Sequence, residues 1–302
     1  MKKIKVKNLS NKTRLDIYLT KALNQKRSHV NKLIENKLIR VNGRLPIKKG
    51  ELIDNDFIIQ VNTLIQKENQ LKSFHQRIKI IYEDNDLIVV DKPKKLIVHP
   101  TSFQEQNTLI NALIHKICIN DFDDPLRPGI IHRLDRNTTG LIVIAKNKKT
   151  YDNLIQQMKN KTLIRKYLAI VHNNIENDFL LINAPIHRSK QNLLKMTVSS
   201  ETKAKPAQTE IKLLENYHNA ALIECHLLTG RTHQIRVHLA YIRHPIYNDD
   251  LYGNYDGYEE YGQFLHAYYL SFVHPTNKQI MEFKSQPDNI FLSLQKKLRS
   301  QT

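Results

Sequence analysis

PGIIHRLDRNTTGLIVIA, residues 128–145, places a dense polar segment directly before an apolar run. The polar part, 132–139, holds one histidine, two arginines, one aspartate, one asparagine and two threonines. Polar residues at this density between apolar runs are typical of a loop that carries function. The run Leu141–Ala145 has the length and composition of a buried strand. The stretch therefore predicts a β-strand that follows directly on a loop rich in polar and charged side chains.

Asp135 is the one acid in this loop, and Arg133 and Arg136 flank it. Nearby positive charge lowers the pKa of a carboxyl group and keeps it ionised. Asp135 is thus suited to act as a nucleophile or a base. The alternative is an aspartate that caps the turn and pairs with a neighbouring arginine. These residues alone leave both interpretations open.

Outside this loop, strand patterns outnumber helical ones, and the two do not alternate regularly. Strands are predicted over 78–82, 87–90, 141–145, 167–171, 220–227 and 265–273, and helices over 107–118, 150–160, 231–242 and 289–298. We therefore expect an α+β domain built on a mixed, largely antiparallel sheet.

A second segment that could contribute functional side chains is LTGRTHQIRVHLA, residues 228–240. On a helix, Thr232, His233 and Arg236 would share one face at spacings of three and four and could converge on one point. A zinc site is not indicated, because His233 and His238 are five residues apart and no Glu or Cys completes a ligand set. A helix with surface histidines is the alternative.

The segment Arg165–Val171 alternates as a strand and places Arg165 and Tyr167 on one face. An aromatic ring beside a cationic cleft can stack on a nucleobase. Without that context, a tyrosine of the core is the more common interpretation.

The charge of the chain is concentrated at its start. Residues 1–50 hold 15 lysines and arginines against Asp16 and Glu35, which makes +13 of the formal net charge of +18. A small module this basic attracts polyanions, and counterion release from phosphates would make binding strong at low salt. Nucleic acid is the expected partner, and a merely solvated lysine-rich surface is the alternative.

Composition sets further limits. Hydrophobic residues make up 40% of the 302 residues, enough for a sizeable core and too many for a disordered basic tail. Apolar runs are far too short for a membrane span, and no apolar segment follows the first lysines as it would in a signal peptide. We therefore expect a cytoplasmic protein. Cys118 and Cys225 lie far apart in apolar contexts, and we expect both in the core.

Taken together, the motifs resemble the RluA family of pseudouridine synthases. DKP (91–93), VHP (98–100), PGIIHRLDRNTTG, RKYLAIV (165–171), LTGRTHQIRVHLA, HPIYNDDLYG (244–253) and LHA (265–267) follow one another in the family's order and rough spacing. The resemblance implies that Asp135 is the catalytic aspartate, that Arg236 pairs with it and keeps it ionised, and that Tyr167 lies against the target uracil. It further implies that Arg133 fills the space that a flipped nucleotide leaves. We also expect RNA contacts from His132, Arg136, Arg231 and His233.

The segment RLDIYLTKALNQKRSHVNKLIENKLIRVNGR, residues 14–44, resembles the S4 RNA-binding domain. In that family the basic helix faces and the nearby turn contact RNA, which implies such contacts for Arg14, Lys26, Arg27, Lys32 and Arg44. We expect a small S4-like α/β domain over 1–62, a linker over 63–76 and a pseudouridine synthase catalytic domain over 77–302.

Three departures from the family patterns are visible. The segment 35–37 has no glycine before the next strand, so Asn36 or Lys37 is expected to adopt a left-handed conformation. Lys94 and Lys95 replace small residues after DKP, and Asn248 stands where glycine is frequent.

The implied reaction breaks the N1–C1′ bond of uridine, rotates the base and rejoins it through C5, without redox change or an external group. The resemblance thus implies an enzyme that isomerises specific uridines of large-subunit (23S) ribosomal RNA, with Asp135 as nucleophile on a flipped-out nucleotide. We expect no cofactor and no metal, ribosomal RNA or pre-ribosomal particles as partners, no membrane association, and a monomer. The motifs favour the RluD-like branch. An RluC-like enzyme with other target uridines and a non-catalytic RNA-binding assembly factor are the alternatives.

Overall fold

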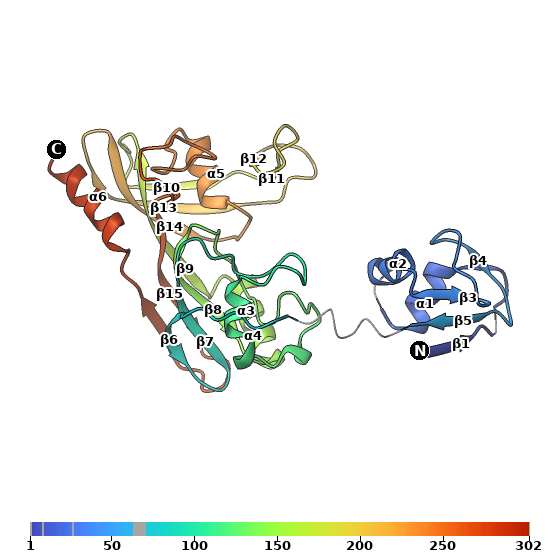
Figure 1. Cartoon of the computed structure of the whole chain (residues 1–302). Coiled ribbons are helices and arrows are strands. Elements are labelled where there is room, and N and C mark those ends of the chain that lie inside the picture. Colours follow the sequence, from blue (N-terminus) through green and yellow to red (C-terminus); the bar gives the residue numbers. More distant parts are fainter. Residues whose placement is uncertain (1, 8, 26, 63–70, 302) are drawn as a thin grey trace. The chain divides into compact units, whose positions relative to one another are not determined.

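The computed structural model describes residues 2–7, 9–25, 27–62 and 71–301. The chain divides into two compact units, Met1–Gln70 and Leu71–Thr302, each with hydrophobic clusters of its own (Figure 1). The expected linker, 63–76, lies partly outside the described residues. Its described part is attached to the second unit, where Asn111 Nδ2 donates to the carbonyl of Lys72 at 2.7 Å. No helix of the described residues is long and apolar enough to cross a membrane.

The first unit combines two helices with short antiparallel strands. These elements are β1 (Lys2–Lys5), β2 (Thr13–Arg14), α1 (Leu15–Ala22), α2 (Arg27–Glu35), β3 (Ile39–Val41), β4 (Leu52–Ile53) and β5 (Ile58–Val61). The strands pair in the order β1-β5-β3, and β2 pairs with β4. Leu15 and Leu19 of α1 pack with Val30 of α2 in the core. Before β3, Lys37 has a φ of +58°, so the expected left-handed position falls on the lysine.

A nine-stranded sheet forms the centre of the second unit. Its order is β10 (Phe179–Asn183), β13 (Gln208–Asn216), β14 (Ala220–Leu227), β9 (Ile164–His172), β15 (Leu265–Val273), β8 (Thr139–Ala145), β7 (Leu87–Lys92) and β6 (Lys79–Glu83), and β16 (Ile280–Lys284) also pairs with β15. The β15–β8 pair is parallel and the other strand pairs of this sheet are antiparallel. The predicted α+β fold with a mixed, largely antiparallel sheet is confirmed.

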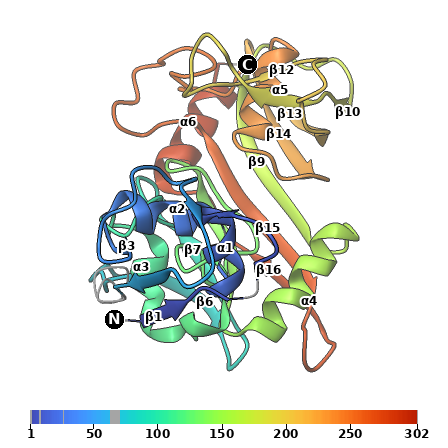
Figure 2. The ribbon, with the colours of Figure 1, turned by 90° about the vertical axis from the view of Figure 1, so that its right-hand side faces the viewer.

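Helices and a small hairpin surround this sheet. They are α3 (Leu109–Leu113), the 3-10 turns η2 (Ile114–Lys116) and η3 (Ile119–Asp121), α4 (Lys148–Lys159), the hairpin β11 (Ile186–Arg188) and β12 (Met196–Val198), α5 (Gln234–Tyr241) and α6 (Asn289–Arg299). Figure 2 shows β9 and β15 running side by side with α4 near one end. Gln157 attaches α4 to the end of β15, because its Nε2 donates to the carbonyl of Val273 at 2.7 Å.

Some sequence expectations need correction. The pattern at 167–171 marks only part of β9, and strands β10, β11, β12, β13 and β16 were not predicted. In β10 four apolar residues follow one another, and two of them, Phe179 at 70% and Leu181 at 58%, are exposed. The predicted helix 107–118 is shorter, since α3 ends at Leu113 and irregular turns follow. Cys225 is buried as expected, but Cys118 is exposed, because it lies in these turns rather than on a helix face that contacts the core.

Candidate active site

Two glycines fix the loop that carries Asp135 against the sheet. Gly129 has a φ of +70° and Gly140 a φ of +107°, values that side chains other than glycine rarely adopt. A Cβ at Gly129 would lie 2.0 Å from the carbonyl oxygen of Ala145, and one at Gly140 would lie 2.3 Å from that of Ala267. Only glycine therefore permits this close approach of the loop ends to β8 and β15.

A buried lysine holds the same loop from the other side. Lys92, at the end of β7, is fully buried, and its Nζ donates to the carbonyls of Pro93 (2.8 Å), Leu96 (2.9 Å) and Arg136 (3.1 Å). Burial lowers the pKa of Lys92 to about 7, against the opposing effect of the Asp135 charge. Because Arg136 follows Asp135 directly, Lys92 helps to define where the aspartate lies.

Arg236 of α5 connects Asp135 to a second carboxylate. Its Nη1 lies 3.4 Å from Asp135 Oδ2, while Nε and Nη2 each donate to Asp249 at 2.7 Å. Burial opposes the charge on Arg236, but hydrogen bonds to Asp249 and the two carboxylate charges outweigh burial and raise the guanidinium pKa. The expected pairing of Arg236 with Asp135 is present, although Asp249 is the closer partner.

His233 also lies near Asp135, but not on the predicted helix face. The helix begins at Gln234 rather than 231, and His233 precedes it in a left-handed conformation with a φ of +55°. Thr232 and His233 thus belong to the turn before α5. From there His233 Nε2 reaches within 4.0 Å of Asp135 Oδ1, while Nδ1 is 2.8 Å from the Tyr252 hydroxyl. Burial lowers the pKa of His233.

Tyr167 approaches the same place from β9. Its side chain is 3% exposed and shares a small pocket with Asp135, Arg133, Arg231, His233 and Arg236. Burial raises the pKa of Tyr167 to about 12, so the hydroxyl is protonated at neutral pH. The pocket measures about 40 Å³, enough for a few waters, since one water needs about 10 to 15 Å³ of such space. A nucleobase would need to displace side chains to enter it.

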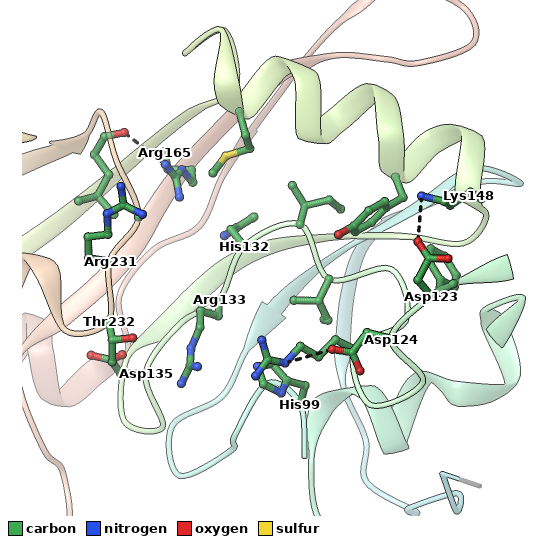
Figure 3. A pocket seen from close by; sticks show the side chains of 18 residues that line it. His99, Asp123, Asp124, His132, Arg133, Asp135, Lys148, Arg165, Arg231 and Thr232 are labelled. Carbon is green, nitrogen blue, oxygen red and sulfur yellow. Dashed lines mark hydrogen bonds and ion pairs between the residues drawn. The ribbon is translucent and has the colours of Figure 1, made fainter. Parts of the chain in front are cut away.

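A larger cavity of about 400 Å³ also has Asp135 in its lining (Figure 3). Predicted residues His132, Arg133, Asp135 and Arg231 line it. Arg136 does not line either space, and it contributes its carbonyl to Lys92 instead. The structure thus brings together the predicted residues of three separate segments, 132–135, 167 and 231–236.

Sequence reasoning did not assign a site role to Lys92, Arg165 or Asp249. Arg165 lies on β9 and lines the larger cavity. Asp249 is fully buried against Arg236. Asp249 and Lys92 lie within the motifs HPIYNDDLYG and DKP, which could have marked them as candidate site residues. Their contacts, however, are with segments distant in sequence, and a motif does not show these.

The two departures from the family pattern in the second unit, at Asn248 and at Lys94 and Lys95, have local explanations. Asn248 has a φ of +56°. This left-handed backbone conformation explains why glycine suits the position, and asparagine also tolerates it. Its buried side chain donates to the carbonyls of Tyr258 and Gly262 (2.9 and 3.1 Å) and so supports the next loop. Lys94 and Lys95 contact that same loop, through the Tyr261 ring and through Glu260. These residues therefore shape the loop 256–262.

The basic residues expected to bind RNA in the first unit differ in their surroundings. Arg14 and Arg27 are exposed and pair with buried Asp16, whose carboxyl pKa the Arg14 hydrogen bond lowers to about 2 despite burial. Arg44 pairs with Glu51. Lys32 is exposed on α2, and Lys26 lies outside the described residues. The arginines thus have structural partners in addition to any role on RNA.

One group of potential metal ligands, Asp84, Asp86 and His274, occurs among the described residues. Its atoms already have partners within the protein. His274 Nε2 lies 2.8 Å from Asp84 Oδ2, and Thr276 Oγ1 donates to Asp86 Oδ2 at 2.6 Å. Asp84 Oδ1 accepts the backbone N–H of Leu87 at 2.9 Å. Through these hydrogen bonds the three residues connect the β6–β7 turn to the segment after β15, which is a structural role.

The site therefore consists of a loop aspartate beside a buried tyrosine and a buried arginine, on a mixed sheet and next to a cationic cavity. The RNA pseudouridylate synthase family model matches residues 86–241, and the S4 domain model matches residues 13–45. The chain belongs to the RNA pseudouridine synthase family. It is an RNA pseudouridine synthase with an S4 domain at its N-terminal end.

Individual relatives cover most of the chain. A protein of Mycoplasma pneumoniae, named an uncharacterized RNA pseudouridine synthase, is 41% identical over 92% of this chain and 90% of its own length. Ribosomal large subunit pseudouridine synthase D of Nitrosomonas europaea is 35% identical over 93% of this chain and 83% of its own. Among solved structures, human RNA pseudouridylate synthase domain containing 1 is similar at a TM-score of 0.56 and 26% identity, covering 72% and 86% of the two chains.

Proposed function

We propose that this enzyme converts specific uridines of large-subunit ribosomal RNA into pseudouridine, with Asp135 as the nucleophile on a flipped-out nucleotide. The choice of RNA is supported by the relatives named ribosomal large subunit pseudouridine synthase D, including those of Nitrosomonas europaea and Zymomonas mobilis. The cytoplasm, where bacterial ribosomes are assembled, would then be its site of action.

The observation that carries the role of Asp135 is its position between two spaces. It lines the larger cavity, which is open to a substrate, and also the small pocket that holds Tyr167 and Arg236. A nucleotide held in the cavity could therefore contact the carboxylate. The ring of Tyr167 would lie against the uracil, and Arg236 would hold the carboxylate through Nη1.

The reaction can be written so that every atom is conserved. The Asp135 carboxylate attacks either C1′ of the ribose or C6 of the base, and the N1–C1′ bond breaks. The detached uracil rotates beside Asp135, and C5 bonds to C1′. After attack at C1′ this step displaces the carboxylate, whereas after attack at C6 the carboxylate–C6 bond breaks once the C5–C1′ bond has formed. The proton on C5 then leaves while N1 gains one, and Asp135 returns to the free carboxylate. Since the base must first leave the RNA stack at a cost of a few kcal/mol, contacts from the basic residues around the cavity would offset that cost.

The test incubates wild type, Asp135→Asn and Asp124→Asn with unmodified large-subunit ribosomal RNA and maps pseudouridine at nucleotide resolution. Asp124 is an exposed carboxylate lining the same cavity and serves as the matched control. We expect new sites with wild type and Asp124→Asn and none with Asp135→Asn, while RNA binding by all three is similar. The positions found would also separate RluD-like from RluC-like targets.

Turnover by Asp135→Asn would refute the role of Asp135. If none of the three proteins forms pseudouridine in this RNA although each binds it, the ribosomal RNA substrate is wrong, or the chain acts in ribosome assembly without turnover. An Asp135→Asn variant that restores assembly as well as wild type would favour the second explanation.

A further inference from the structure

Arg165 is a buried cation without an anionic partner. It lies on β9, is 5% exposed, and its Nη2 reaches the carbonyl oxygen of Leu227 only at 3.4 Å. Its Nε is buried without any hydrogen-bond partner. Burial lowers the pKa of Arg165, and the described residues offer no carboxylate charge to oppose this effect. A buried charge left unpaired is costly, so its retention calls for an explanation outside the free protein.

His132 provides a second donor without an acceptor. The backbone N–H of Val143 donates to His132 Nε2 at 3.3 Å. Burial, with a smaller effect of the Arg165 charge, lowers the pKa of His132 to about 3, so the ring is neutral. In a neutral ring whose Nε2 accepts, Nδ1 carries the proton. That Nδ1 is buried without a hydrogen-bond partner.

Both residues line the larger cavity beside Asp135, and the charges around that cavity are unevenly matched (Figure 3). At its rim, Arg127 pairs with Asp124 and Lys148 with Asp123, each at 3.9 Å. Among the described residues, Arg133, Arg165 and Arg231 of the lining form no ion pair with a carboxylate. The part of the cavity next to Asp135 is therefore positively charged.

Gly230, next to Arg165, leaves space for the guanidinium. A Cβ at Gly230 would lie 3.1 Å from Arg165 Nη1, closer than side chains usually approach. The absence of a side chain at Gly230 thus keeps Nη1 unobstructed at the cavity. A planar guanidinium with free N–H groups suits the acceptor-only oxygens of a phosphate.

We propose that Arg165 and neutral His132 together bind one backbone phosphate of the RNA strand that carries the target uridine. This inference rests on the proposed function and identifies a phosphate contact of the same site. An uncompensated cation beside a donor with no acceptor matches a phosphodiester anion better than a nucleobase, whose carbonyls carry no charge. Because Asp135 lines the same cavity, a phosphate held there would position the neighbouring ribose relative to the carboxylate.

The test is a binding cycle between the full-length protein and RNA. Three proteins are compared, and all carry Asp135→Asn so that no turnover occurs. The first has no other substitution and is called the Arg165 protein, the second also carries Arg165→Gln, and the third also carries Arg127→Gln. The probe is a short RNA around a uridine that wild type converts or, if none is converted, the large-subunit fragment that it binds most tightly. Single methylphosphonate linkages remove the charge from one phosphate at a time.

We expect Arg165→Gln to weaken binding about tenfold to a hundredfold, as loss of a charge-assisted hydrogen bond predicts. One methylphosphonate position should weaken binding by the Arg165 protein at least about tenfold and leave Arg165→Gln nearly unaffected. The protein with Arg127→Gln, whose arginine is paired at the rim, should respond to that linkage as the Arg165 protein does.

Equal losses in the Arg165 and Arg165→Gln proteins at every linkage would overturn the proposal, as would the absence of any sensitive linkage. If thermal melting shows that Arg165→Gln does not fold, Gly230→Ala takes its place, because its methyl group would crowd the guanidinium and should reduce the coupling. Turnover by wild type is measured separately. Absence of pseudouridine would refute the proposed function and leave the binding cycle readable.

Discussion

Arg236 lies closer to Asp249 than to Asp135. It donates to the two Asp249 oxygens at 2.7 Å each, against 3.4 Å to Asp135. Asp249 also accepts the backbone N–H groups of Leu251 and Tyr252, both at 3.2 Å. A bidentate pair of this kind fixes the plane of a guanidinium. Asp249 is therefore a positioning residue that orients Arg236 toward the candidate nucleophile.

Asp249→Asn should slow pseudouridine formation without weakening RNA binding. An amide cannot accept both hydrogen bonds from Arg236, so the guanidinium would lose its fixed orientation. We expect kcat to fall about tenfold to a hundredfold, roughly 1.4 to 2.7 kcal/mol of barrier, with Kd changed less than about twofold. Single-turnover kinetics measures the effect, and Asp250→Asn, an exposed neighbour, is the control. Equal rates for the two variants would show that Asp249 does not position Arg236.

Replacing Tyr167 separates its ring from its hydroxyl. Tyr167→Phe keeps the ring, while Tyr167→Leu removes it. Stacking of a base on an aromatic ring contributes about 1 to 3 kcal/mol, so Tyr167→Leu should lose about fivefold to a hundredfold more kcat/KM than Tyr167→Phe. Because the pKa of Tyr167 is about 12, wild type and Tyr167→Phe should have rate profiles of the same shape from about pH 6 to 9. A limb of the wild-type profile that is lost in Tyr167→Phe would contradict this.

Lys92→Met should destabilise the protein, by an amount that depends on pH. The variant removes the hydrogen bonds of Lys92 to three backbone carbonyls, of which the charged ammonium satisfies three and the neutral amine two. We expect this loss to lower the free energy of unfolding by about 2 kcal/mol. The pKa of Lys92 is about 7 in the folded protein and about 10.4 in an unfolded chain. Between these values the unfolded state binds more protons, so the contribution of Lys92 to stability rises with pH.

Denaturant unfolding of wild type and Lys92→Met between about pH 7 and pH 10 measures this effect, since the stability difference should grow as the pH is raised. Lys149→Met serves as the control because Lys149 is exposed on α4. A stability difference that is constant over this range would mean that Lys92 keeps an ordinary pKa in the folded protein.

Deleting residues 1–62 should weaken RNA binding and flatten its dependence on salt. The deleted segment includes the 1–50 region with its net +13, and each phosphate contact contributes about −0.9 to the slope of log K against log salt. We expect the slope to become less negative by about 3 or more. The core of the second unit consists of residues from 71 onward, so its thermal unfolding should persist. An unchanged slope would show that the basic unit does not bind RNA phosphates.

The amino-acid sequence by itself was enough to predict many of the strands and helices and the side chains available for chemistry. Apolar runs rich in strand-forming residues predicted β14 and β15 over 220–227 and 265–273, because this signal depends on local composition alone. The excess of strand patterns over helical ones predicted the fold class, and the order of the motifs predicted the family and the part that Asp135 is expected to play. Helix ends were less accurate, since α5 begins after His233 has taken a left-handed conformation that no periodicity reveals.

The tertiary structure decided which of these groups meet. Asp135, Tyr167, Arg236 and Asp249 come from four segments, and only the order of strands β14, β9, β15 and β8 brings them to one place. The lack of an acceptor for Nε of Arg165 is likewise a property of its surroundings, because a sequence records that an arginine is present but not which partners remain within reach. Hydrogen bonds and ion pairs act over a few ångströms in space, whereas the sequence orders residues only along the chain.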